Sequence, residues 1–123
     1  MTTMKSILII DDDSLLRGML KDVFEFNGFK VYAASHGQAG IDLYRKEHVD
    51  LVITDIVMPG KDGLETIRDL KKEYPDVKII AISGANTVAP DRLQVARGFG
   101  AIHTIRKPFM PDDILKAVRE ILV

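Results

Sequence analysis

Residues 51–65 read Leu-Val-Ile-Thr-Asp-Ile-Val-Met-Pro-Gly-Lys-Asp-Gly-Leu-Glu. The short apolar run Leu51–Thr54 predicts a buried strand, and apolar residues with helical spacing over 64–70 predict a helix after it. The Pro, Gly and Asp residues between the two favour a turn. The stretch therefore predicts one strand–turn–helix unit with a carboxylate, Asp55, where the strand ends.

The same unit recurs on both sides of this stretch. Four more short apolar runs are separated by segments with helical spacing; the runs are Ser6–Ile10, Lys30–Ala34, Lys78–Ile82 and Ile102–Ile105. Five strands in strict alternation with five helices indicate an α/β fold, in which helices cover both faces of a parallel sheet. The order of the strands in the sheet does not follow from this alternation.

Length and composition favour a single domain over residues 1–123, with 46% hydrophobic and 28% charged residues. A net charge of −1 argues against a general nucleic-acid-binding surface. The longest apolar runs are too short to cross a membrane, no signal-peptide core precedes the first strand, and there are no cysteines. We therefore expect a cytoplasmic protein that binds neither membrane nor nucleic acid.

Polar residues follow four of the five predicted strands. They are Asp11 and Asp12 after the first strand, Asp55 after the third, Ser83 after the fourth, and Arg106 and Lys107 after the fifth. In an open α/β sheet, ligands bind beyond the carboxyl ends of the strands, where the strand order reverses. The sequence thus predicts that three acids, a hydroxyl group and a lysine gather at one edge of the sheet.

Three neighbouring carboxylates need either raised pKa values or a cation between them. A ligand set made only of oxygen atoms favours a hard ion such as Mg²⁺. Asp55 could then attack a phosphorus centre and form an acyl phosphate. Mg²⁺, Lys107 and the Ser83 hydroxyl group would hold the oxygens of the transferred group.

Each of these residues also has a simpler interpretation. An Asp at a strand end is most often a helix cap, and we expect that role for Asp13 with Ser14. Lys107 alone would be a solvated lysine, and Ser83 with Gly84 an ordinary turn. The coincidence of compatible chemistry at four strand ends favours a functional site.

The chain resembles the receiver domains of bacterial two-component response regulators over essentially its whole length. The resemblance rests on specific motifs: Ile7-Leu8-Ile9-Ile10-Asp11-Asp12 with Arg17 after it, the stretch 51–65, Ile79-Ile80-Ala81-Ile82-Ser83-Gly84, and Lys107-Pro108-Phe109. It implies a flavodoxin-like, doubly wound (βα)5 fold with strand order 2-1-3-4-5.

The resemblance also implies a role for each site residue. Asp55 would be the phosphorylation site, and Lys107 and Ser83 would contact the phosphoryl group. Asp12, Asp55 and the backbone carbonyl of Val57 would bind Mg²⁺, with Asp11 acting mainly through water. The Lys107–Pro108 peptide bond would be cis.

By the same resemblance, a sensor histidine kinase or a phosphotransfer protein would supply the phosphoryl group. The domain would catalyse only its own phosphorylation and dephosphorylation, and is not otherwise expected to be an enzyme. Because no output domain follows residue 123, we expect a conformational shift to signal to a separate downstream protein. That protein would dock around Arg92, His103 and Arg106.

Two features depart from the usual receiver pattern. Thr104 stands three residues before Lys107, where most members carry an aromatic residue that acts as a rotamer switch. The segment 84–90 is slightly longer than in many relatives. Both features affect the expected conformational switch and leave the phosphoacceptor chemistry intact.

Three other functions are compatible with parts of the sequence. A haloacid-dehalogenase-type phosphatase would use Asp11 as its nucleophile, but this leaves 55–63 unexplained. A flavodoxin-like phosphate or flavin binder would need a Ser/Thr/Gly-rich loop where Asp11 and Asp12 stand. A degenerate receiver would act only as a docking module.

Overall fold

The computed structural model describes residues 4–58, 60–84 and 92–122. Strands and helices alternate along the chain as β1 (Ser6–Ile10), α1 (Ser14–Phe26), β2 (Lys30–Ala34), α2 (Gly37–Glu47), β3 (Leu51–Asp55), α3 (Gly63–Glu73), β4 (Ile79–Ser83), α4 (Arg92–Phe99), β5 (His103–Arg106) and α5 (Pro111–Ile121). All strand pairs are parallel, and the sheet has the order β2-β1-β3-β4-β5. The predicted fold class and strand order are confirmed.

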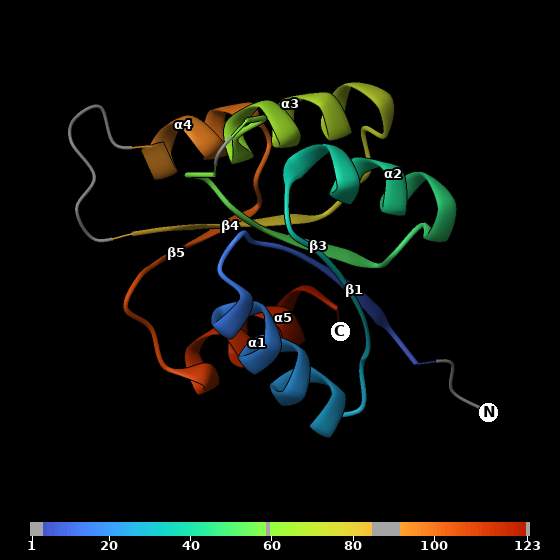
Figure 1. The fold of residues 1–123 in the computed structure, drawn as a ribbon, viewed down its shortest axis with the longest axis vertical. Helices are drawn as coiled ribbons and strands as arrows, with labels where there is room; N and C mark the ends of the chain where they lie inside the picture. Colours follow the sequence, from blue (N-terminus) through green and yellow to red (C-terminus); the bar gives the residue numbers. More distant parts are fainter. Residues whose placement is uncertain (1–3, 59, 85–91, 123) are drawn as a thin grey trace.

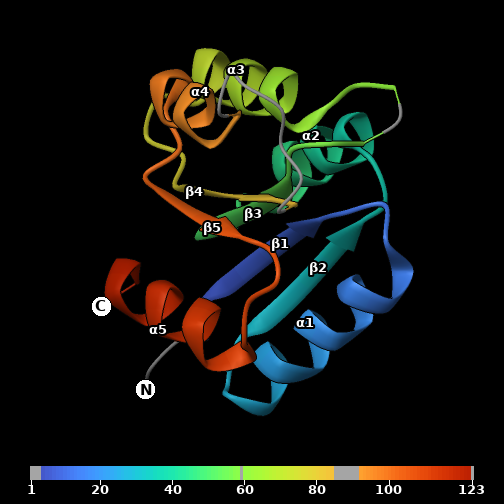
Figure 2. The same ribbon diagram turned by 90° about the vertical axis from the view of Figure 1, so that its left-hand side faces the viewer.

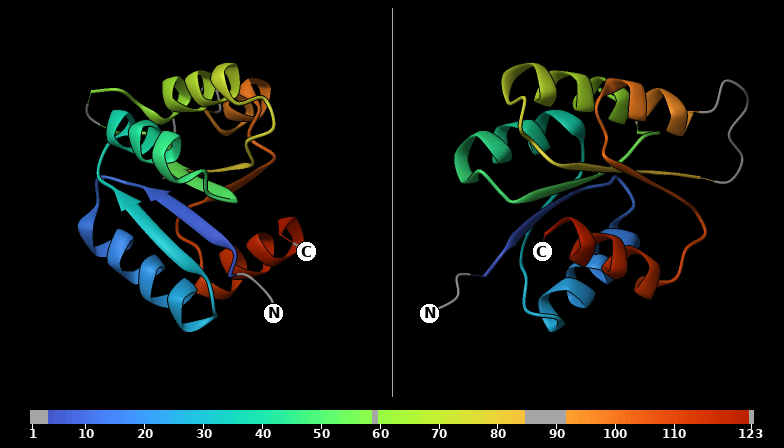
Figure 3. Two further views of the ribbon diagram at one scale, coloured as in Figure 1. Left: turned by 90° about the vertical axis from the view of Figure 1, so that its right-hand side faces the viewer. Right: turned by 180° about the vertical axis from the view of Figure 1, so that it is seen from behind.

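Helices cover the sheet on both faces. α1 and α5 lie against one face, and α2, α3 and α4 lie against the other (Figures 1 and 2). The same two layers are seen from the opposite side and from behind (Figure 3). Each face has its own hydrophobic core, so that Ile7 and Ile9 of β1 pack toward α1 and α5 whereas Leu8 and Ile10 pack toward α2. Burial on both faces explains why the central strands read as uninterrupted apolar runs.

Three strands end one residue later than the sequence predicts. Asp55, Ser83 and Arg106 are the last residues of β3, β4 and β5, whereas they were expected just after these strands. Sheet hydrogen bonding continues past the apolar runs, since Lys107 N–H donates to the Ser83 carbonyl oxygen at 2.7 Å. The polar residues at these strand ends are therefore held by the sheet itself, which makes them rigid supports for a site.

The helix starts follow the expected capping chemistry. The Asp13 side chain accepts hydrogen bonds from Leu15 N–H and Leu16 N–H, at 3.0 and 3.3 Å, which confirms its predicted capping role. Asp62 caps α3 in the same way, and Pro111 is the first residue of α5, where its missing N–H group costs no helical hydrogen bond. Within the described part of the chain, no helix is both long and apolar enough to cross a membrane.

Candidate functional site

The carboxyl ends of the central strands bring the predicted acids together. Asp11 and Asp12 follow β1, and Asp55 ends the neighbouring strand β3. Oxygen atoms of the three carboxylates lie within 4.8 Å of one another. Asp11 and Asp55 are 1% and 6% exposed, whereas Asp12 is exposed. The predicted cluster therefore exists, with two buried acids and one that faces solvent.

Each buried carboxylate has one oxygen held by the backbone. Asp11 Oδ1 accepts a hydrogen bond from Asp13 N–H, and Asp55 Oδ1 accepts one from Ile56 N–H, both at 2.9 Å. Asp11 Oδ2 is buried and has no hydrogen-bond partner within the described ranges. A buried acceptor without a donor is costly, and this oxygen set fits a hard divalent cation such as Mg²⁺.

Lys107 supplies positive charge to the cluster from the far side of β4. Its ammonium group donates a hydrogen bond to Asp55 Oδ2 at 3.3 Å and lies 3.6 Å from Asp11 Oδ2. The peptide bond from Lys107 to Pro108 is cis, as the resemblance implied. Lys107 thus pairs with both buried carboxylates of the three-acid cluster.

Burial dominates the electrostatics of both inner carboxyl groups. It raises the pKa of Asp11 from 3.8 to about 6, and the charge of Asp55 adds to the rise while the Asp13 N–H group and Lys107 oppose it. Burial also raises the pKa of Asp55, against the lowering effect of Lys107. An added cation would relieve both effects, which further supports a metal site.

Ser83 lies at the end of β4, between β3 and β5 in the sheet. Its side chain is fully buried, and among the described residues its Oγ has no hydrogen-bond partner. Buried hydroxyl groups are normally paired. This hydroxyl group lies at the end of the strand next to the one that ends in Asp55, so it can serve an incoming group at this edge.

Other predicted residues lie around this cluster. Val57 is exposed and follows Asp55 by two residues in the loop between β3 and α3. Thr104 Oγ1 accepts a hydrogen bond from Arg97 Nε at 3.2 Å, which links β5 to α4 at the position that departs from the usual receiver pattern. Of the segment 84–90, only Gly84 is among the described residues, so the expected longer loop lies outside them.

Gly63 is a neighbour of the site whose role is not predicted from the sequence. A Cβ atom on Gly63 would overlap the carbonyl oxygen of Asp55 and would lie 2.5 Å from Cα of Ile56. Only glycine therefore allows α3 to begin this close to the acidic strand end. The Asp62-Gly63 pair after the turn is the sequence signal, although its meaning depends on the packing of α3.

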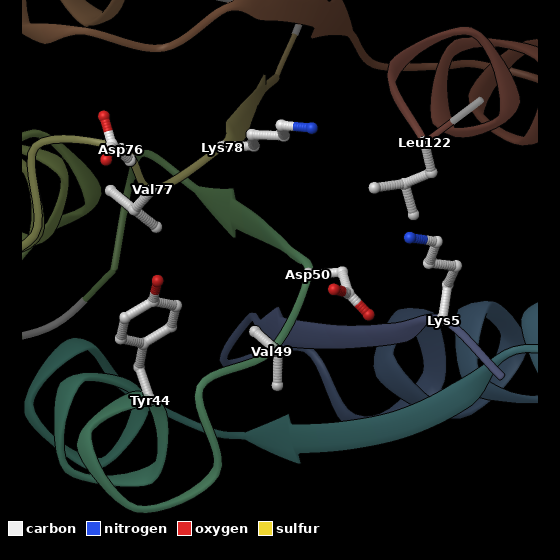
Figure 4. Close-up of a pocket in the computed structure, with 8 residues that line it drawn as sticks. All are labelled: Lys5, Tyr44, Val49, Asp50, Asp76, Val77, Lys78 and Leu122. Carbon is white, nitrogen blue, oxygen red and sulfur yellow. The ribbon is translucent and has the colours of Figure 1, made fainter. Parts of the chain in front are cut away.

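A separate cavity of about 220 Å³ lies where β3 and β4 begin, at the opposite edge of the sheet. Figure 4 shows Asp50 near its centre, with the Lys5 and Lys78 side chains extending toward Leu122. Asp50 already accepts hydrogen bonds from the Ser6 N–H and hydroxyl groups. The cavity shares no residue with the acid cluster, and we assign it no role in the chemistry at that cluster.

Comparisons with known proteins agree with this geometry. The sequence model of the response regulator receiver domain matches residues 7–119. The chain is 36% identical over 119 residues to the chemotaxis protein CheY of Bacillus subtilis, covering 94% of this chain and 96% of the relative. It is 32% identical over 118 residues to sporulation initiation phosphotransferase F of the same organism, covering 96% and 94%.

Solved structures show the same architecture. A response regulator receiver domain protein from Clostridium thermocellum has a TM-score of 0.88 and 30% sequence identity, with 96% of this chain and 94% of that chain covered. These similarities extend over the strands and helices that carry the acid cluster.

Proposed function

Because this chain belongs to the response regulator receiver domain family, we propose that Asp55 is its phosphoacceptor residue and that phosphoryl transfer to Asp55 depends on Mg²⁺ bound at the acid cluster. Receiver domains are phosphoacceptor signalling domains of two-component systems, and they work with histidine kinases or phosphotransfer proteins and with downstream targets. Membership in this family does not favour a phosphatase with Asp11 as its nucleophile.

The observation that carries the proposal is the placement of Asp55. Its Oδ1 is held by Ile56 N–H, while its Oδ2 points to the Lys107 ammonium group. Asp11 and Asp12 lie within 4.8 Å of the same carboxylate. Asp55 is thus a fixed nucleophile between a permanent cation and the acids that would hold a second cation.

Four groups would hold Mg²⁺. Asp12 and Asp55 would bind it directly, the backbone carbonyl of Val57 would be a third ligand, and Asp11 would act through a water molecule. When bound, Mg²⁺ supplies the positive charge that balances the carboxylates and the phosphoryl oxygens.

The transfer itself exchanges one bond to phosphorus for another. A carboxylate oxygen of Asp55 forms a bond to phosphorus, and the bond from phosphorus to the imidazole nitrogen of a phosphohistidine donor breaks. The electron pair of that bond leaves with the imidazole. Lys107 stabilises the charge that builds up on the phosphoryl oxygens, and Ser83 donates its hydroxyl proton in a hydrogen bond to one of them.

Phosphorylation would change the surface as well as the site. Ser83 and Lys107 would move toward the phosphoryl group and shift the conformational equilibrium around β4 and α4. A partner protein would then read the face formed by α4, β5 and α5, near Arg92, His103 and Arg106. We propose that the domain does this in the cytoplasm and catalyses only its own phosphorylation and dephosphorylation.

The direct test is to incubate the protein with acetyl phosphate and to measure its intact mass. We expect one phosphoryl adduct in the presence of Mg²⁺ and none in EDTA. A folded protein that binds Mg²⁺ but forms no adduct would instead indicate a docking module, or a receiver that accepts the group only from its own kinase.

A further inference from the structure

We propose that Gly37, the first residue of α2, is a positioning residue for the loop that follows the phosphoacceptor strand. The inference rests on the proposed function. Because Gly37 has no side chain, α2 can pack against the end of the loop between β3 and α3. The position of that loop then sets the affinity of the acid cluster for Mg²⁺.

Gly37 is buried in a space that has no room for a methyl group. A Cβ atom there would overlap the hydroxyl oxygen of Thr66 and would lie 2.9 Å from the carbonyl oxygen of Lys61. Gly37 is not among the glycines with positive φ, so an alanine could adopt its backbone conformation. The requirement for glycine therefore comes from its neighbours.

The two residues that pack against Gly37, Thr66 and Lys61, lie where the loop between β3 and α3 joins α3. The Thr66 hydroxyl group donates a hydrogen bond to the Asp62 carbonyl oxygen at 2.8 Å. The Lys61 ammonium group forms an ion pair with Asp69 of α3 and lies 3.4 Å from the side-chain oxygen of Gln38 in α2. α2, the loop end and α3 are thus joined at one point.

This junction is in direct contact with the backbone of the phosphoacceptor. Gly63 N–H donates a hydrogen bond to the Ile56 carbonyl oxygen at 2.7 Å. As described above, there is no space between Gly63 and the backbone of Asp55 and Ile56. Since close-packed interiors transmit displacements, a shift of the junction would move Asp55 and the start of the Val57 loop.

α2 cannot easily retreat from an added methyl group at Gly37. One turn further on, a Cβ atom on Gly40 would overlap the side chain of Ile10, the last residue of β1. α2 is therefore already in close contact with the sheet. An added methyl group would displace the loop end on its other side.

The test is a titration of Gly37→Ala with Mg²⁺, in which NMR chemical shifts report metal binding. A thermal unfolding curve of the same variant measures its stability. We expect the Mg²⁺ dissociation constant to rise about tenfold, as is usual when groups that support metal ligands are disturbed. Saturating Mg²⁺ should restore most of the phosphorylation rate with acetyl phosphate. The matched control is Gly18→Ala in α1, where no atom lies within 4 Å of the new methyl group and the dissociation constant should not change.

A second variant tests the same junction without a change in the core. Lys61→Met removes the partly buried ion pair with Asp69, and we expect Mg²⁺ binding to weaken about threefold, within the range of a surface ion pair. Electrostatics alone predicts the opposite, because the loss of a positive charge near the site would strengthen Mg²⁺ binding. The direction of the change therefore separates the two explanations.

A lowered melting temperature with an unchanged Mg²⁺ dissociation constant in Gly37→Ala would overturn the inference, because Gly37 would then serve stability alone. If that variant does not fold, equal or tighter Mg²⁺ binding by Lys61→Met overturns it, and weaker binding supports it. A failure of the unsubstituted protein to bind Mg²⁺ would instead contradict the proposed function.

Discussion

The ammonium group of Lys107 lies 3.3 Å from Oδ2 of Asp55, although the two residues come from strands that are not neighbours. Asp55 ends β3, Lys107 follows β5, and the pair spans the end of β4. The same ammonium group lies 3.6 Å from Asp11. Lys107 is therefore a fixed positive charge at an edge where three carboxylates meet.

Replacing Lys107 with Met should separate catalysis from metal binding. We expect the rate of phosphorylation by acetyl phosphate to fall about 100-fold, because one preorganised charge on the phosphoryl oxygens is lost. Mg²⁺ should bind as tightly as before or more tightly, since a competing cation is gone. Intact-mass time courses and a Mg²⁺ titration measure the two effects, and an unchanged rate would remove Lys107 from the proposed mechanism.

Asp11 should make the metal-free protein less stable as the pH rises. Its pKa is about 6 in the folded state against an ordinary value of 3.8. The unfolded chain therefore releases this proton first, and the free energy of unfolding falls between about pH 4 and pH 6. The cost at neutral pH is on the order of 2–3 kcal/mol, because each pKa unit corresponds to about 1.4 kcal/mol.

Asp11→Asn should remove much of this decrease in the free energy of unfolding with pH, and should stabilise the protein at pH 7 in EDTA. Urea unfolding at several pH values measures the pH dependence of the free energy of unfolding. Asp76→Asn is the control, because Asp76 is exposed and remote from the cluster. If the free energy of unfolding of Asp11→Asn depends on pH as it does in the unsubstituted protein, the burial of Asp11 is not the cause of the decrease.

Ser83→Ala should affect function more than stability. The Ser83 hydroxyl group has no hydrogen-bond partner among the described residues. Its removal should therefore lower the free energy of unfolding only slightly or increase it. We expect phosphorylation to slow about tenfold, because one donor to the phosphoryl group is lost. A matched Ser6→Ala substitution at the start of β1 should leave the rate unchanged. A large loss of stability with a normal rate would contradict the role of Ser83.

Thr104→Val tests the link between β5 and α4. The substitution removes the acceptor of the Arg97 hydrogen bond and keeps the shape of the side chain. We expect amide hydrogen exchange in α4 to become about threefold faster, within the range of one exposed hydrogen bond, while the phosphorylation rate stays the same. Unchanged exchange throughout α4 would show that this hydrogen bond does not hold the helix.

The sequence predicted the sheet well for a physical reason. Strands such as β1 are buried on both faces, with Ile7, Leu8, Ile9 and Ile10 all at most 1% exposed, and a strand of this kind reads as an unbroken apolar run. The gathering of Asp11, Asp12 and Asp55 followed from the shared direction of parallel strands. The strand order came only from the family resemblance, since alternation alone does not determine it.

Features that depend on close contacts between elements were not predictable in the same way. Gly37 and Gly63 look like ordinary turn or helix-start residues, and only the packing of α2 and α3 reveals why no side chain fits there. That Ser83 Oγ has no hydrogen-bond partner among the described residues likewise depends on the surrounding packing. The one-residue extension of β3 placed Asp55 inside the sheet because hydrogen bonding does not stop where the apolar run stops.

The most direct measurement is the intact mass of Asp55→Asn after incubation with acetyl phosphate and Mg²⁺, beside the unsubstituted protein and Asp76→Asn. The account predicts one phosphoryl adduct on the unsubstituted protein and on Asp76→Asn, and none on Asp55→Asn although it remains folded. An adduct on folded Asp55→Asn that equals that of the unsubstituted protein would contradict the assignment of Asp55 as the phosphoacceptor.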